Sequence, residues 1–393
     1  MLRKKIYLDI IYLSLLIYIL FSIIFLFYKS TIPHDFSMSE MLVNYNGGFS
    51  SRGFNGHIFY LISNFAKINI INVVLFFQII FVILFVYSIY KLISQIKFKI
   101  NLIDLVILLS PIALFFPIYE YEALGRNEIL ILISFIYLIL LDGKPNSKII
   151  FSYSFIVLPF LILNWEVSLL YFPFFFMVFF LKFKINNIKF LFRISLIFLP
   201  SLIIMFFIYQ NPLTQEKLDL MCNTIPCFAR LNETYNFDLD FIKFFDWVHG
   251  RTTLINYLRY FLILILSYLP FYFLINLNDK FTHDFYLLKI FRNYIYLLIF
   301  LSLPQIIIFL YALDWSRYLN ISIMMSYFFI LFLRKSNLLN EIKDISLEKN
   351  KKFFLKFLII IYLFFWYPKL TLWDDIGSFP ILRSLNRLKD IVF

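Results

Sequence analysis

The residues best suited to chemistry lie in one short stretch near the N-terminus, residues 44–57, which reads NYNGGFSSRGFNGH. Four of the chain's eight glycines fall in this stretch, on both sides of Arg52. Glycine permits positive φ angles and close approach of the backbone to a ligand, and a guanidinium binds phosphate or carboxylate through paired hydrogen bonds. The stretch therefore predicts a shaped loop that holds an anion. A connecting loop with turn glycines and an interfacial arginine is the alternative.

Three further clusters of polar residues interrupt an otherwise apolar chain. They read YEYEALGRNE over Tyr119–Glu128, NWE over Asn164–Glu166 and LDWSRY over Leu313–Tyr318. With the first stretch, they supply residues that suit the binding of a charged, sugar-bearing substrate: Arg52, Arg126, Arg317, Glu120, Glu122, Asn127, Trp165 and Trp315. Arg251, at the end of a long polar loop, is a further candidate for substrate binding.

Two of the arginines have carboxylates nearby in the sequence. Arg126 stands at the expected start of a helix, and a helix N-terminus favours anions. Its alternative role is a local ion pair with Glu122 or Glu128. Asp314 and Arg317 are spaced i, i+3, so they can face each other on one helix. Each arginine is therefore a candidate either for phosphate binding or for a local ion pair.

Three residues are candidates for a catalytic base: Glu166, Asp314 and His57. Glu166 has no cation close to it in the sequence and lies beside Trp165. A carboxylate next to an aromatic ring at a membrane face is expected to have a raised pKa, which suits it to accept a proton. An exposed loop glutamate and an interfacial histidine are the alternatives. Trp165 and Trp315 lie inside charged clusters, which keeps a sugar-stacking role open beside the interfacial anchoring common for tryptophan.

The elements that must position these residues are membrane-spanning helices. Hydrophobic residues make up 62% of the 393-residue chain and charged residues 15%, whereas soluble domains average about 45–50% and about 25%. Mean hydropathy is +0.84. Apolar segments recur at about the 20-residue length that a helix needs to cross a bilayer, and the alternation typical of a transmembrane barrel is absent. The predicted fold class is an all-α polytopic membrane protein.

We expect eleven transmembrane helices in a single domain, residues 1–393, with the N-terminus in the cytoplasm. The expected spans are Ile6–Tyr28, Ile70–Tyr90, Leu102–Pro117, Ile129–Leu141, Ile149–Leu163, Leu169–Leu181, Phe192–Tyr209, Leu254–Ile275, Tyr294–Tyr311, Tyr318–Leu333 and Phe353–Tyr367. Most of the 36 lysines and arginines then lie in inner segments, as the positive-inside rule requires. Residues 29–69 form the first external loop and an interfacial helix, and residues 210–253 form a large external loop. The net charge of +12 thus reflects membrane topology, and we expect no nucleic-acid partner.

The only two cysteines, Cys222 and Cys227, fall in the large external loop as CNTIPC. An oxidising compartment would let them form a disulfide, and two unpaired thiols are the alternative. No histidine stands near them to complete a zinc site, so we expect no metal. The sequence contains no P-loop, GxGxxG, HExxH or GxSxG motif. We therefore expect no cofactor, and a substrate that reaches the outer face attached to a lipid.

All four polar clusters face the outside in this topology. We expect Arg52, Arg126 and Arg317 to converge on one cavity near the outer headgroups, where guanidinium groups suit a diphosphate. A nearby carboxylate can take a proton from a sugar hydroxyl, and fixed cations can stabilise a departing lipid diphosphate. These features predict glycosyl transfer from a polyprenyl diphosphate carrier.

The arrangement resembles the bacterial O-antigen polymerases and related integral-membrane glycosyltransferases of the GT-C class. The segments GGFSSRGFNG, ALGRNEILIL, NWEVSLLYFPF and LDWSRYLNI resemble a pattern of surface-polysaccharide polymerases that reads roughly GGFxRRGLxG, GRK[DE], HE and DWGRW. The chain departs from this pattern at four places: Ser51 replaces an arginine, Asn127 a lysine and Ser316 a glycine, and Asn164–Trp165 stands where a histidine would precede Glu166.

The resemblance implies a GT-C-like, metal-independent polymerase at the periplasmic face of the bacterial inner membrane. It would join polyprenyl-diphosphate-linked oligosaccharide units into O-antigen or capsular polysaccharide. The lipid bilayer is the second partner, and a membrane protein that regulates chain length is a third that the resemblance allows. One alternative is a GT-C enzyme that adds a single sugar from a polyprenyl monophosphate. The other is a lipid-linked glycan flippase or transporter, against which the span centres argue because they hold little charge and no glycine.

Overall fold

The part of the chain that the structure describes is mostly helical and contains one small two-stranded sheet. The computed structural model describes residues 2–32, 36–96, 100–143, 145–183, 195–225, 241–276, 294–338 and 349–392. Their backbone divides into two compact units. Unit 1 comprises Met1–Phe21, Ile89–Ala123 and Val248–Phe393, and unit 2 comprises Ser22–Ser88 and Leu124–Trp247. The long helices α1 (Leu2–Ser30) and α4 (Ile70–Gln95) contribute residues to both units.

Six helices in the described part of the chain are long and apolar enough to cross a membrane. They cover Lys5–Ser30, Ile70–Gln95, Ser147–Asn164, Glu166–Phe183, Leu254–Tyr272 and Trp315–Lys335. A seventh span is counted if the pair Leu196–Gln210 and Gln215–Cys222, bent by 94°, forms one. The chain is therefore a polytopic helical membrane protein, as its hydropathy predicts.

Four of the eleven expected spans fall on shorter or interrupted helices. The expected span Leu102–Pro117 holds α5 (Leu102–Leu108) and the start of α6 (Phe116–Tyr119), and Tyr294–Tyr311 divides into α18 (Tyr294–Ser302), η6 (Leu303–Gln305) and α19 (Ile306–Tyr311). The other two correspond to α7 (Ile129–Leu140) and α21 (Lys349–Phe364). Proline explains the two interruptions, since it lacks the backbone N–H that a helix interior needs, and Pro111 and Pro304 stand at these breaks.

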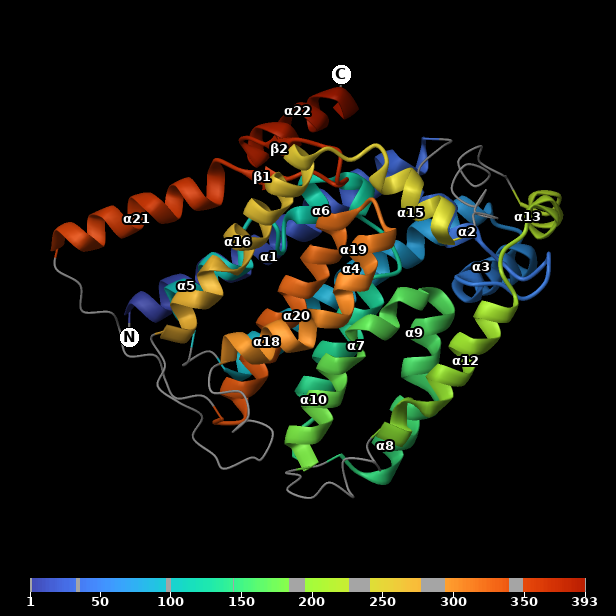
Figure 1. The fold of residues 1–393 in the computed structure, drawn as a ribbon, viewed down its shortest axis with the longest axis horizontal. Coiled ribbons are helices and arrows are strands. Elements are labelled where there is room, and N and C mark those ends of the chain that lie inside the picture. Colours follow the sequence, from blue (N-terminus) through green and yellow to red (C-terminus); the bar gives the residue numbers. More distant parts are fainter. Residues whose placement is uncertain are drawn as a thin grey trace. The chain divides into compact units, whose positions relative to one another are not determined.

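Unit 2 contains a group of packed helices and a short helical hairpin. The group consists of α7, α8 (Ser147–Ser152), the π-helical η3 (Tyr153–Val157), α9 (Leu158–Asn164), η4 (Glu166–Tyr171), α10 (Phe172–Phe183), η5 (Leu196–Phe198) and α12 (Leu199–Gln210). In Figure 1, α12 lies beside α9 and α10 beside α7, which agrees with their contacts. Aromatic side chains fill the interior, where the Phe135 ring lies 6.1 Å from that of Phe174 and 5.2 Å from that of Phe175.

The helical hairpin of unit 2 joins α2 (Phe36–Leu42) to α3 (Gly53–Ala66). The two helices approach so closely at Gly56 that an added Cβ would lie 1.9 Å from the Val43 carbonyl oxygen. Only glycine permits this approach. Helix α3 covers the segment expected to be interfacial, and the ring of Phe65 near its end is exposed. The glycines of the first stretch therefore have a packing role as well as a loop role.

The segment expected to form the large external loop, residues 210–253, is described in part. Its helices are α13 (Gln215–Cys222) and α15 (Phe241–His249). Cys222 is disulfide-bonded, and Cys227, the other cysteine of the sequence, lies outside the described residues.

Unit 1 is built around α20 (Trp315–Lys335), whose residues from Ser316 to Arg334 are all buried. Helices α5, α16 (Leu254–Asn276) and α19 contact it. The C-terminal end of α20 is held by Arg334, whose Nη1 lies 2.6 Å from both carboxylate oxygens of buried Asp104. Asp104 also completes the capping box of α5 with Asn101. This ion pair joins α20 to the start of α5.

The C-terminal part of unit 1 forms a small sheet and a last helix. Strands β1 (Tyr367–Pro368) and β2 (Ile376–Gly377) pair antiparallel, with Tyr367 opposite Gly377. Helix α22 (Pro380–Val392) follows them. Short η2 (Tyr121–Ala123), after α6, belongs to the same unit and meets this region through side chains described below.

Candidate functional site

The glycine-rich stretch forms an irregular loop that ends at Arg52. The side-chain oxygen of Asn44 accepts from the N–H of Asn46, and the Gly48 N–H donates to the Tyr45 carbonyl. Helix α13 is joined to the loop by a hydrogen bond, in which Lys217 Nζ donates to the Phe49 carbonyl at 3.0 Å. The loop therefore has a defined shape and delivers the chain to the start of α3.

Arg52 is the residue that precedes α3, and its backbone is left-handed, with φ 62° and ψ 4°. A non-glycine residue adopts this region rarely and at an energetic cost that the surrounding structure must offset. Its side chain makes the compensating contacts. The Nε atom donates to both oxygens of Glu166 at 3.0 Å, and Nη2 donates to Glu166 Oε1 at 2.6 Å. This is a paired, charge-assisted contact between two segments that are distant in the sequence.

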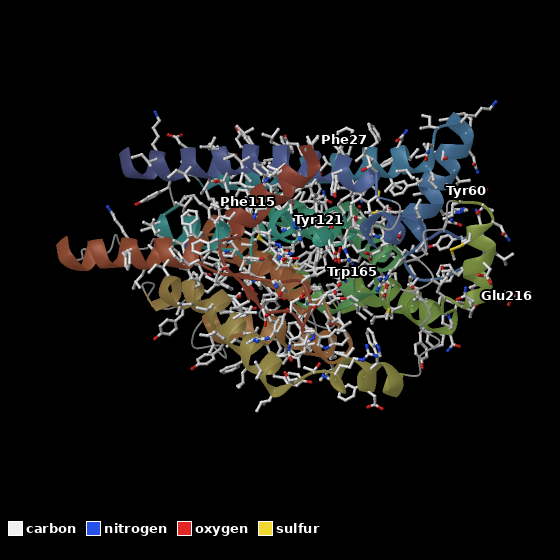
Figure 2. The ribbon with its side chains drawn as sticks, turned by 90° about the horizontal axis from the view of Figure 1, so that it is seen from above. Phe27, Tyr60, Phe115, Tyr121, Trp165 and Glu216 are labelled. Carbon is white, nitrogen blue, oxygen red and sulfur yellow. The ribbon has the colours of Figure 1, made fainter. Side chains whose placement is uncertain are left out.

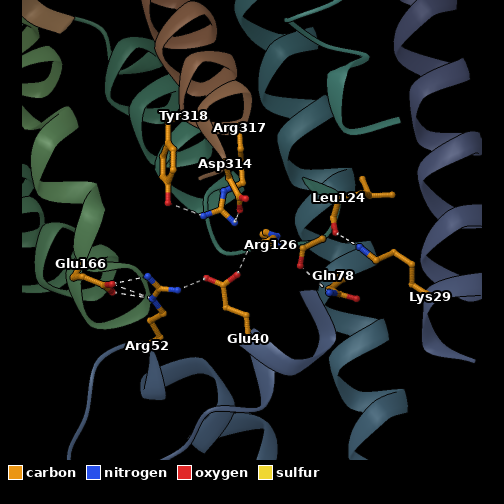
Figure 3. A network of polar contacts seen from close by, with 11 residues as sticks. Lys29, Glu40, Arg52, Gln78, Leu124, Arg126, Glu166, Asp314, Arg317 and Tyr318 are labelled. Atoms are coloured by element: carbon orange, nitrogen blue, oxygen red, sulfur yellow. Dashed lines mark hydrogen bonds and ion pairs between the residues drawn. The ribbon is translucent and has the colours of Figure 1, made fainter. Parts of the chain in front are cut away.

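Glu40 of α2 lies between two guanidinium groups (Figure 3). Its Oε1 accepts from Arg52 Nη1 at 3.5 Å, and its Oε2 accepts from Arg126 Nη1 at 3.4 Å. Charge-assisted hydrogen bonds of this kind are usually about 2.7–2.9 Å long, so both contacts are weak compared with the Arg52–Glu166 pair. We call Glu40, Arg52, Arg126 and Glu166 the two-arginine cluster.

The two-arginine cluster has a buried side and an accessible side. The Arg126 and Glu40 side chains are 8% and 6% exposed, whereas those of Arg52 and Glu166 are 19% and 22% exposed. A ligand from solvent or from the membrane surface would therefore meet Arg52 and Glu166 first.

The turn before α7 sets the position of Arg126. Two consecutive carbonyls of this turn accept hydrogen bonds from side chains of other helices. Lys29 Nζ of α1 donates to the Leu124 carbonyl at 2.8 Å, and Gln78 Nε2 of α4 donates to the Gly125 carbonyl at 2.7 Å (Figure 3). Gly125 has φ +78°, and a Cβ there would lie 2.7 Å from Gln78 Nε2. The turn needs glycine for both reasons, and it aims Arg126 at Glu40.

Glu128, at the start of α7, adds a third carboxylate to this neighbourhood. Burial raises the pKa of Glu128 well above its ordinary value, and the charge of Glu40 raises it further, while Arg126 and Arg52 lower it. The net direction is upward, which favours a protonated Glu128 beside the two-arginine cluster.

Three asparagines connect the segments that carry the cluster. Asn55 of α3 donates through its backbone N–H to Asn164 Oδ1 and through Nδ2 to Asn127 Oδ1, both at 2.9 Å. Asn164 Nδ2 donates to the Phe160 carbonyl. Asn127, a candidate for substrate binding, is therefore part of the framework that ties α3, α7 and α9 together.

Trp165 and His57 are neighbours of the cluster in sequence but pack against aromatic rings. Trp165 is 1% exposed, and its ring stacks on that of Tyr171 with centroids 5.8 Å apart. In Figure 2 it lies among other side chains, whereas Glu216 on α13 points outward. The His57 ring lies 5.4 Å from that of Tyr45. Among the described residues no hydrogen bond or ion pair joins His57 to the two-arginine cluster, so Glu166 is the candidate base that the cluster contains.

Arg317 and Asp314 form their own pair in unit 1. Arg317 Nη1 lies 3.2 Å from Asp314 Oδ2, which is the expected i, i+3 ion pair, and Nη2 donates to the Tyr318 hydroxyl at 2.8 Å. Trp315 lies among the rings of Tyr257, Tyr260 and Phe309, at centroid distances of 6.1, 5.1 and 5.1 Å. This part of unit 1 therefore repeats the pairing of an arginine with a carboxylate.

The remaining candidates of unit 1 lie in two places. Glu120 is buried. Its Oε2 accepts from Arg383 Nη2 at 3.0 Å, and its Oε1 lies 2.8 Å from the same nitrogen as an ion pair. Burial raises the pKa of Glu120 to about 7, although the arginines beside it act to lower that pKa. Glu122 is half-buried in η2, and Arg251 is exposed between α15 and α16.

Several residues of these sites lie outside the four polar clusters of the sequence. Glu40 was not a sequence candidate, although it is the only acidic residue between Asp35 and Glu120 except Asp104. The signal for Glu40 in the sequence is that it is an isolated acidic residue in the expected first external loop, close to Arg52. Lys29 falls in the expected first external loop, and Arg383 falls after the last expected span, in the C-terminal tail.

The fold and the site define a polytopic helical membrane protein with a partly buried cluster of arginines and carboxylates. No protein-family model, curated protein or solved structure that was compared with the chain matches it. Among the described residues, no group of three or more histidine, cysteine, aspartate or glutamate side chains is arranged to hold a metal ion. The two-arginine cluster offers two guanidinium groups, which suit an anion, and carboxylates, which suit a proton.

Proposed function

We propose that the protein is a membrane glycosyltransferase that polymerises polyprenyl-diphosphate-linked oligosaccharide units at the periplasmic face of a bacterial inner membrane. The observation that carries the proposal is the convergence of Arg52 and Arg126 on Glu40, with Glu166 bonded to Arg52. Two guanidinium groups and a carboxylate at one place are what glycosyl transfer from a lipid diphosphate requires.

The diphosphate would bind where Glu40 now bridges the arginines. The Glu40 contacts of 3.4 and 3.5 Å are long, so a phosphate with more acceptor oxygens and more negative charge can replace them with shorter bonds. Arg52 is accessible enough to meet the ligand, and Arg126 is held at a fixed distance by its turn. The two cations then stabilise the charge that develops on the departing lipid diphosphate.

Glu166 would serve as the base. When a phosphate engages Arg52, the Glu166 carboxylate is released to accept the proton of an acceptor sugar hydroxyl. The hydroxyl oxygen attacks the anomeric carbon of the donor sugar, and the glycosidic bond forms there. The bond between that carbon and the diphosphate oxygen breaks, and its electron pair leaves with the lipid diphosphate. Asp314, paired with Arg317, is the second carboxylate of this kind.

Chain length in cells tests the proposal. A strain that depends on this protein for its polysaccharide receives wild type, Arg52→Ala or Lys148→Ala, where Lys148 is an exposed cation of unit 2. We expect a ladder of glycan lengths with wild type and Lys148→Ala. Arg52→Ala should give single repeat units only, at equal protein level in the membrane.

The pattern of bands also separates the alternatives. A wild-type protein that yields one discrete band in place of a ladder would indicate transfer of a single sugar from a polyprenyl monophosphate. A full ladder with Arg52→Ala would remove the two-arginine cluster from the reaction. A loss of all surface glycan, with lipid-linked units retained inside the cell, would indicate a flippase.

A further inference from the structure

The last helix of unit 1 carries two arginines that meet the Tyr121 segment. Arg383 and Arg387 are one turn apart on α22. Arg383 donates from Nη1 to the Tyr367 hydroxyl at 2.6 Å and from Nη2 to Glu120. The guanidinium of Arg387 lies over the ring of Tyr121, 4.1 Å from its centroid. The aromatic ring therefore fixes the plane of the second guanidinium.

The two arginines of this group are not equally paired. Glu120 forms an ion pair with Arg383, but among the described residues no carboxylate lies within ion-pair distance of Arg387. Glu122 acts on Arg387 electrostatically without pairing with it. Arg387 Nη1 and Arg383 Nε are buried, and neither has a hydrogen-bond acceptor among the described residues.

Burying a cation and its donors without an acceptor is unfavourable. Burial and the charge of Arg383 accordingly lower the pKa of Arg387 below its ordinary value. An anion bound here would accept hydrogen bonds from the unsatisfied donors. It would also reduce the electrostatic repulsion between the two guanidinium groups. A guanidinium group that is already stacked on an aromatic ring loses little conformational freedom when it binds a phosphate.

The opposite face of α22 is apolar and exposed. It carries Ile381, Leu382 and Leu385. The exposed ring of Phe379, just before α22, lies 5.0 Å from the exposed ring of Phe365 at the end of α21. A helix with a basic face and an apolar face is typical of one that lies in the bilayer surface. We call these exposed residues the α22 apolar strip.

We propose that Arg387 and Arg383 bind the phosphate of an anionic membrane phospholipid, with its acyl chains along the α22 apolar strip. The unsatisfied guanidinium donors account for the phosphate, and the strip accounts for a lipid in place of free phosphate. The site is independent of the two-arginine cluster, which belongs to unit 2, and it does not depend on the proposed reaction.

Lipid retention by the purified full-length protein tests this site. Native mass spectrometry in a non-ionic detergent measures binding of phosphatidylglycerol, of zwitterionic phosphatidylcholine and of inorganic phosphate. The variants are Arg387→Gln and the matched control Lys389→Gln, which removes an exposed cation from the same helix. Among the described residues Arg387 stacks on a ring and forms no hydrogen bond or ion pair, so its variant should fold, and thermal unfolding verifies this.

We expect wild type and Lys389→Gln to retain phosphatidylglycerol with equal affinity and in preference to phosphatidylcholine. Arg387→Gln should weaken that binding about tenfold or more, because a charge-assisted hydrogen bond is lost. Arg387→Lys should restore part of it, since lysine keeps the charge without the planar fork. Unchanged phosphatidylglycerol binding by folded Arg387→Gln would overturn the proposal. Inorganic phosphate that competes as well as the lipid would overturn the role of the α22 apolar strip.

Discussion

Replacing Glu40 by glutamine should destabilise the protein and yet strengthen its binding of a diphosphate. In the folded state Glu40 shares its two oxygens between Arg52 and Arg126. Glu40→Gln keeps the shape of the side chain and one acceptor, but it removes the negative charge between two cations. Breaking a fully buried ion pair costs about 3–5 kcal/mol. The long contacts of Glu40, and the bonds that Arg52 keeps with Glu166, place the loss at about 1–3 kcal/mol.

The same change removes a competitor for the arginines. A carboxylate and a phosphate charge about 4 Å apart repel by about 4 kcal/mol at an effective dielectric constant near 20. Reorganisation of water and side chains offsets much of this. We therefore expect pyrophosphate to bind Glu40→Gln about tenfold more tightly than wild type, which corresponds to about 1.4 kcal/mol. Added pyrophosphate should then recover most of the lost stability, since a ligand of the folded state stabilises it.

Thermal unfolding in detergent, with pyrophosphate titrated at constant ionic strength, measures both effects. The matched control is Glu216→Gln, which removes an exposed carboxylate of unit 2. The control should behave as wild type. Weaker pyrophosphate binding by Glu40→Gln would refute the reasoning, because it would mean that Glu40 positions the arginines and does not compete with the ligand.

Three other predictions concern stability. Gly125→Ala should cost about 1–3 kcal/mol, because alanine disfavours φ +78° and its Cβ would meet neighbouring atoms at 2.7 Å; an unfolding midpoint equal to that of wild type would contradict this. Asp104→Asn should cost about 3–5 kcal/mol, because it leaves the buried Arg334 guanidinium without its carboxylate, and the double variant with Arg334→Met should recover part of the loss. Glu120 should make stability fall with rising pH. Its folded-state pKa of about 7 exceeds the ordinary 4.5, so its contribution is complete below pH 4.5 and is lost as the pH rises through 7, by about 3 kcal/mol in all. Unfolding measured from pH 4.5 to 8 should show this slope in wild type and a smaller slope in Glu120→Gln, and an undiminished slope in that variant would assign the effect to another group.

Hydropathy predicts the class of the fold because crossing a bilayer requires long apolar helices. It predicts the helix boundaries less well where the apolar run contains proline. Residues 102–117 and 294–311 are apolar enough to span, but Pro111 and Pro304 interrupt the backbone hydrogen bonds there. Run length and composition alone therefore do not separate one helix from two shorter ones.

The candidate site shows a similar division. The sequence identifies Arg52, Arg126 and Glu166 as polar residues in unusual surroundings, but it does not reveal that Arg52 pairs with Glu166 across 114 residues. Nor does the sequence reveal that Arg126 pairs with Glu40, toward which the Gly125 turn and the Lys29 and Gln78 hydrogen bonds aim it. Such pairings depend on tertiary packing, which spacing along one segment cannot express.

A structure with the substrate's headgroup bound tests the central claim most directly. Electron cryomicroscopy of the protein in nanodiscs with a polyprenyl diphosphate should show phosphate density within hydrogen-bond distance of both Arg52 and Arg126. Glu40 should have moved away from at least one of them. Phosphate density elsewhere, with Glu40 still bridging both guanidinium groups, would contradict the proposed role of the two-arginine cluster.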